Sequence, residues 1–146
     1  MTDKWILVAN AAHAALFAKP GRSRRLRLLQ EFTHPASRKK AVDLVTDRNG
    51  RYEATGNTHG AFTSATEPKR TEMMHFAREL AGMLEHGRAT NQYQRLVLVA
   101  SPHFLGMLLG RLTPAVQALL SDTVKKDFTR FDAGGLSVQL SRLIVV

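Results

Sequence analysis

The stretch Arg95-Leu96-Val97-Leu98-Val99-Ala100 decides the fold. A short, continuous apolar run that ends in turn residues, here Ser101-Pro102, is typical of a strand that is covered on both faces. Residues 5–9, Trp-Ile-Leu-Val-Ala, form a second run of the same kind. Two such strands need a layer on each side, so the sequence predicts a sheet with helices packed against it.

Further strands and helices are predicted on both sides of these runs. Residues 14–18 and 25–32 have strand length and, with residues 5–9, predict a three-strand meander. Between residues 68 and 86, apolar side chains recur at helical spacing, which predicts an amphipathic helix. That helix has Thr66 as a candidate N-cap, Pro68 for its first turn and Gly87 as its stop.

The remaining elements complete one layered domain. Residues 36–46 suit a short helix, and further elements are expected as a helix after Ser101-Pro102 with Ser101 as its cap, a helix from Thr113-Pro114, a strand around 123–129 and a C-terminal amphipathic stretch with Leu136 and Leu140. The order predicts an α/β fold, a mixed β-sheet with flanking helices in a single domain over residues 1–146.

Residues 47–68 form a polar, glycine-broken segment that we interpret as a long loop. Loops beyond roughly 12–15 residues are uncommon in compact domains, and those that persist are usually functional or mobile. The candidate loop residues are Gly50, Tyr52, Gly56, Asn57, His59 and Gly60. Cations interleaved with rings, as Arg48 and Arg51 are with Tyr52, can neutralise phosphates and stack on unpaired bases. The segment is therefore a candidate RNA contact.

The charge of the chain points in the same direction. The net charge is +9 over 146 residues, and residues 19–51 hold ten Lys or Arg against three acidic residues. Such a cluster attracts polyanions, of which nucleic acids and anionic membrane surfaces are the usual ones. The candidate phosphate-binding residues are Arg24, Arg25, Arg27, Arg38, Lys39, Lys40, Arg48, Arg51, Lys69 and Arg70.

Several classes of site find no support in the sequence. The chain has no cysteine, which excludes disulfides and thiolate metal sites. The histidines show no metal-ligand spacing, and no Walker or Gly-x-Gly-x-x-Gly pattern is present, so neither a metal nor another cofactor is expected. Ser101-Pro102-His103 follows a central strand but lacks the Gly-x-Ser-x-Gly elbow of hydrolases. Without a signal peptide or a transmembrane run, the protein is expected in the cytoplasm.

Five segments of the chain together resemble the bacterial host attachment protein family: residues 5–10, 44–51, 76–80, 96–106 and 126–129. The most specific are the Thr-Asp-Arg-x-Gly-Arg run at residues 46–51 and the Ala-x-Pro-x-Phe-Leu-Gly run at residues 100–106. The resemblance implies a bacterial protein named for a phenotype, attachment to host cells. The family in turn resembles the central domain of archaeal and eukaryotic peptide-chain release factors and Pelota, which implies a ribonuclease-H-like α/β layer.

In those release factors, a long loop carries Gly-Gly-Gln into the peptidyl-transferase centre. Here the corresponding segment reads Gly56-Asn57-Thr58-His59-Gly60, so peptidyl-tRNA hydrolysis is not implied. The resemblance leaves the ribosome, ribosomal RNA or transfer RNA as candidate partners, and we expect an RNA- or ribosome-associated binding module. Two alternatives remain: a small hydrolase or nuclease that uses loop residues such as His59, and a protein-interaction factor needed for attachment.

Overall fold

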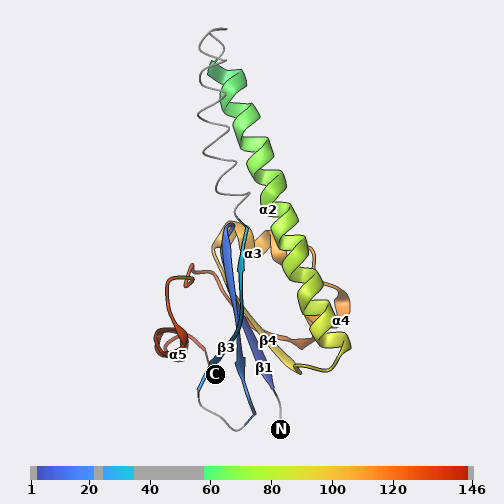
Figure 1. Cartoon of the computed structure of the whole chain (residues 1–146), viewed down its shortest axis with the longest axis vertical. Coiled ribbons are helices and arrows are strands. Elements are labelled where there is room, and N and C mark those ends of the chain that lie inside the picture. The colour runs from blue at the N-terminus through green and yellow to red at the C-terminus, as the bar shows by residue number, and fades with distance from the viewer. Residues whose placement is uncertain (1–2, 22–24, 35–57, 145–146) are drawn as a thin grey trace.

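The computed structural model describes residues 3–21, 25–34 and 58–144, with residues 58–68 described by their backbone alone. Its elements are β1 (Lys4–Ala9), β2 (His13–Lys19), β3 (Arg27–Thr33), α2 (Thr58–Ala89), β4 (Arg95–Ala100), α3 (Pro102–Leu109), α4 (Pro114–Leu119), β5 (Leu120–Val124) and α5 (Ala133–Ser141) (Figure 1).

The described strands form one five-stranded sheet in the order β3-β2-β1-β4-β5. β2 runs antiparallel to both of its neighbours, whereas β1 pairs in parallel with β4, and β4 in parallel with β5. The three-strand meander predicted from the sequence is therefore confirmed. So is the fold class, an α/β fold with a mixed sheet and flanking helices.

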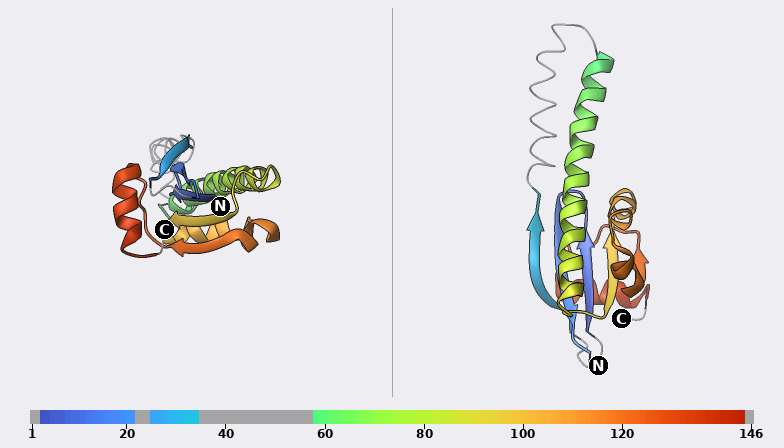
Figure 2. Two further views of the ribbon diagram at one scale, coloured as in Figure 1. Left: turned by 90° about the horizontal axis from the view of Figure 1, so that it is seen from below. Right: turned by 90° about the vertical axis from the view of Figure 1, so that its right-hand side faces the viewer.

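Helices cover both faces of this sheet, as the views along and across it show (Figure 2). Alternate residues of β1 point to opposite faces: Leu7 packs with Phe76 and Leu80 of α2, whereas Ile6 packs with Leu136 of α5. α3 and α4 join α2 on its face, which we call the α2 face, and α5 lies on the other, which we call the α5 face. The continuous apolar runs of β1 and β4 follow from this double cover.

α2 corrects the predicted loop at residues 47–68. The helix begins at Thr58 rather than near Pro68 and ends at Ala89, so Gly87 lies inside it. The glycines and Pro68 led us to predict a break, but a proline inside a helix costs about 3 kcal/mol and does not forbid the helix. Residues 35–57, which include the helix expected at 36–46 and the first half of the expected loop, lie outside the described residues.

Two smaller predictions also need correction. β5 ends at Val124 and does not continue to residue 129. The carboxylate of Asp127 accepts a hydrogen bond from the backbone N–H of Thr129, a local turn that competes with strand pairing. Ser101 stands at the N-cap of α3, but its side chain makes no capping hydrogen bond; Thr113 does cap α4, accepting from the N–H of Val116.

Candidate nucleic-acid interface

The candidate phosphate-binding residues that the structure describes are all exposed. Arg27 is the first residue of β3 and Arg25 lies two residues before it, whereas Lys69 and Arg70 lie on α2. Arg24, Arg38, Lys39, Lys40, Arg48 and Arg51, with Gly50, Tyr52, Gly56 and Asn57, lie outside the described residues. His59 and Gly60 belong to the first turn of α2 and not to a loop, which corrects their predicted setting.

β3 is an edge strand of the sheet, and most of its residues are exposed. Its register with β2 places Arg27 opposite Ala18, which faces α2, and Leu28 opposite Phe17, which faces α5. Residues directly opposite each other in neighbouring strands share a face. The side chain of Arg27 therefore emerges on the α2 face of the molecule, beside the long helix.

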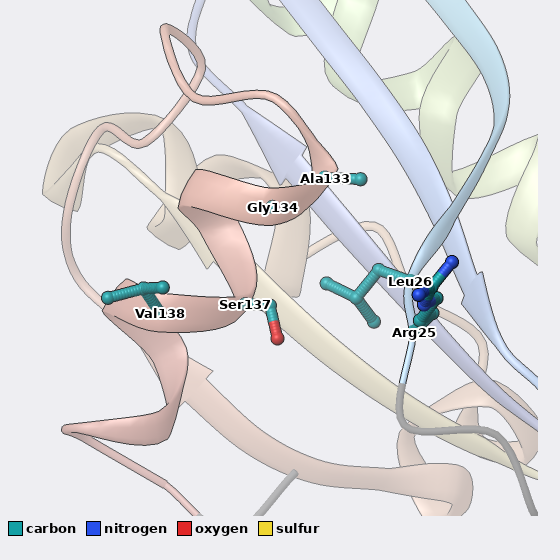
Figure 3. Close-up of a pocket in the computed structure, with 6 residues that line it drawn as sticks. All are labelled: Arg25, Leu26, Ala133, Gly134, Ser137 and Val138. Carbon is teal, nitrogen blue, oxygen red and sulfur yellow. The ribbon is translucent and has the colours of Figure 1, made fainter.

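A shallow cleft separates the start of β3 from α5 (Figure 3). Its volume is about 400 Å³, and it is lined by Arg25, Leu26, Ala133, Gly134, Ser137 and Val138. Leu26 projects toward α5, while Ser137 supplies a hydroxyl from the helix. The cleft thus places one guanidinium and one hydroxyl beside small or apolar residues. The cleft therefore lies on the α5 face of the β3 edge, whereas Arg27 lies on the α2 face.

The far end of β3 is joined to α2 by His34. Its Nε2 lies 3.0 Å from a carboxylate oxygen of Glu72, and its ring stacks on the ring of Phe76 with the centroids 5.1 Å apart. Phe76 is fully buried in the core. This contact ties the edge strand to α2. Lys69 and Arg70 lie within one turn of Glu72, on the side nearer the start of the helix.

A second polar cluster lies where the parallel strands end. The side-chain amide of Asn10, which follows β1, donates to the carboxylate of Asp127 at 3.0 Å and to the hydroxyl of Thr129 at 3.2 Å. Its carbonyl oxygen accepts from the backbone N–H groups of Ala12 and His13, both at 2.8 Å. The cluster closes the β1–β2 turn against the segment after β5.

The pKa of Asp127 reflects these contacts. Partial burial alone would raise it, but hydrogen bonds from the Thr129 side chain, from Asn10 and from the Thr129 backbone, together with the charge of Arg130, hold the pKa below its ordinary value. The carboxylate is thus an ionised acceptor that organises the turn. Sequence reasoning did not single out Asn10 or Asp127 as site residues, although both belong to segments that carry the family resemblance.

The described residues bring together no metal-binding set. No three His, Asp or Glu side chains among them gather to hold a metal ion. His103 is exposed at the start of α3, next to Ser101, whose side chain has no capping role. Within the described ranges, no helix is long and apolar enough to cross a membrane.

Comparison with known families now places the chain. Residues 5–140 match the family described as "Protein required for attachment to host cells". The chain belongs to this host attachment family. The comparison with curated proteins finds no match.

Among solved structures, the host attachment protein is similar to a chain of a "PilM-PilN type IV pilus biogenesis complex". The identity is 18%, the TM-score is 0.44, and the match covers 94% of this chain and 41% of the other. The chain thus spans less than half the length of that protein. The resemblance to release factors and Pelota is not confirmed by these comparisons.

Proposed function

We propose that this host attachment protein is a cytoplasmic RNA-binding module, which contacts phosphates through cations on β3 and α2. The observation that carries the proposal is the part of α2 that projects beyond the sheet and carries two exposed cations. The helix has 32 residues, about 48 Å at 1.5 Å per residue, and its start rises well beyond the sheet (Figure 1). Lys69 and Arg70 are exposed further along the helix, about 17 Å from its start at Thr58.

The shape and the charge of this region suit a long polyanion. The first part of α2 projects beyond the ends of the strands (Figure 2), which gives a nucleic-acid strand a long element to follow. Arg25 and Arg27 lie at the opposite end of β3, about 20 Å away along a seven-residue strand. Phosphate contacts spread over such a distance neutralise successive charges of one strand. The net charge of +9 favours the encounter.

The proposal is tested by measuring the binding of labelled single-stranded RNA and of an RNA hairpin over a range of salt concentrations. For single strands, each neutralised phosphate contributes about 0.7 to the slope of log affinity against log salt. We expect Lys69→Gln with Arg70→Gln to weaken binding and to flatten that slope by about 1.4. Arg25→Gln with Arg27→Gln should act in the same direction.

The matched control removes the same charge from another part of the surface. Arg111 follows α3 and Arg142 follows α5, and both are exposed. Arg111→Gln with Arg142→Gln should leave the slope unchanged, so a uniform loss across all three double variants would mean a mere effect of net charge and would contradict a defined interface. Purification from cells with a ribonuclease-resistant protein partner, and without RNA, would favour the protein-interaction alternative instead.

A further inference from the structure

Three cations lie side by side at one end of three neighbouring strands, β2, β1 and β4. In the strand register, Lys4 of β1 is opposite Lys19 of β2 on one side and opposite Arg95 of β4 on the other. Directly opposite residues share a face of the sheet. Two residues along each strand, Ile6, Phe17 and Val97 pack into the core beneath α5, so the three cations also point to the α5 face.

This row brings together like charges that ordinarily repel. Neighbouring strands are about 4.8 Å apart, so the backbones of Lys19 and Arg95 are separated by only about 10 Å, with Lys4 between them. Like charges directly opposite each other destabilise a sheet. In the described part of the chain, no carboxylate lies within ion-pair distance of any of the three.

The nearest carboxylates do not balance the row. Asp122 of β5, opposite Val97, shares the face and opposes the repulsion in part. Asp3 accepts a hydrogen bond from the N–H of Gly21. Partial burial, followed by the charges of Lys19 and Arg95, lowers the pKa of Lys4 despite the opposing effect of Asp122. A bound anion would relieve this shortage of negative charge.

We propose that Lys4, Lys19 and Arg95 form a binding site for a phosphate or pyrophosphate group. A guanidinium can hold two oxygens of such a group at once, and two ammonium groups beside it add charge without a fixed geometry. The site lies at the amino end of β1, whereas the start of α2 rises beyond the opposite end of the sheet (Figure 1). Lys69 and Arg70 are therefore far from the site, whereas Arg27, opposite Ala18, lies at the same end of the sheet but on its α2 face. The measurement with free phosphate involves no RNA, so its outcome does not depend on that proposal.

The test is the heat unfolding of the full chain in sodium phosphate and in sodium chloride at equal ionic strength, repeated with pyrophosphate. We expect phosphate to raise the midpoint by about 3–6 °C at ten times its dissociation constant. Lys4→Gln and Arg95→Gln should abolish the difference between the two salts, and Lys4→Arg should retain it. Without phosphate, Lys4→Gln should melt no lower than the unchanged protein, because one like charge is gone.

The control separates a site from a general salt effect, since phosphate also stabilises proteins by exclusion from their surface. Lys125→Gln and Lys126→Gln remove exposed charges beyond β5, and both should keep the full phosphate effect. An equal rise in all variants, or no rise in the unchanged protein, would overturn the proposal. Adenosine monophosphate compared with adenosine identifies the source of the group: a rise with the monophosphate alone means a nucleotide-borne phosphate, and a rise with inorganic phosphate alone means the free ion.

Discussion

The side-chain amide of Asn10 donates a hydrogen bond of 3.0 Å to the carboxylate of Asp127, across 117 positions of the sequence. The bond joins the end of β1 to the segment that follows β5, and the same amide also reaches Thr129. With its carbonyl oxygen, Asn10 holds the start of the β1–β2 turn. One side chain therefore fixes two connections near opposite ends of the chain.

Replacing this side chain should weaken the whole fold. Asn10→Ala removes four hydrogen bonds and leaves partly buried groups without a partner, which costs about 1–3 kcal/mol of unfolding free energy. Urea unfolding followed by circular dichroism measures the change. Because the bonded elements share one sheet, the transition should remain single and simply move to lower urea. Two separated transitions would contradict this coupling.

Acid should act on the same cluster through Asp127. Its folded pKa is lowered from the ordinary value of 3.8, so the ionised carboxylate contributes stability above that value and loses it as the pH falls through the folded pKa. We expect Asp127→Asn to be less stable than the unchanged protein at neutral pH. The difference in unfolding free energy between the two proteins should narrow as the pH is lowered toward about 2, which a series of urea titrations measures. A constant difference would assign the loss to packing rather than to charge.

Two glycines of α2 should respond in opposite ways to alanine. A Cβ at Gly87 would lie 2.5 Å from the ring of Trp5, which is buried and stacked on Tyr93. Gly87→Ala should therefore cost about 1–3 kcal/mol through overpacking. A Cβ at Gly82 meets nothing within 4 Å, so Gly82→Ala should stabilise the helix by about 0.5–1 kcal/mol. Thermal unfolding of both variants checks the sign of each change.

Thr113 links the start of α4 to α2. Its hydroxyl donates to the carboxylate of Glu85 at 2.7 Å and accepts from the N–H of Val116 at 3.2 Å. Thr113→Ala should lower the unfolding free energy by about 1 kcal/mol, the usual value of an N-cap. Thr113→Ser keeps the hydroxyl and should lose much less. Equal losses in chemical denaturation would point to the methyl group instead.

The phenol of Tyr93 should resist ionisation in the folded protein. Burial, followed by the nearby carboxylate of Glu85, raises its pKa to about 12 against the effect of Arg88, and its hydroxyl donates to the carbonyl of Leu84 at 2.7 Å. Stability should fall as the pH rises from 10.0, the ordinary value, through about 12. In a Tyr52→Phe variant, which leaves one of two tyrosines, phenolate absorbance should appear only with unfolding. Titration near pH 10 in the native state would refute this.

The sheet could be predicted because its signals are local. The apolar runs of β1 and β4, the meander and the apolar face around Phe76 and Leu80 each follow from spacing within a few residues. The start of α2 could not be predicted in this way, because Gly60 and Pro68 are breakers that a longer helix tolerates. The site features were missed for another reason. Asn10 and Asp127, like Lys4 and Arg95, become neighbours only through strand order and register, which no short window of sequence contains.

The length of α2 sets the distance between its start and the part of the helix that packs on the sheet. From Thr58 to Phe76, the first fully buried residue among the described side chains of α2, the helix runs about 27 Å. This is more than the length of the six-residue strand β1. A molecule that contacts only the first turns of α2 therefore lies beyond the ends of the strands and does not touch the sheet (Figure 1).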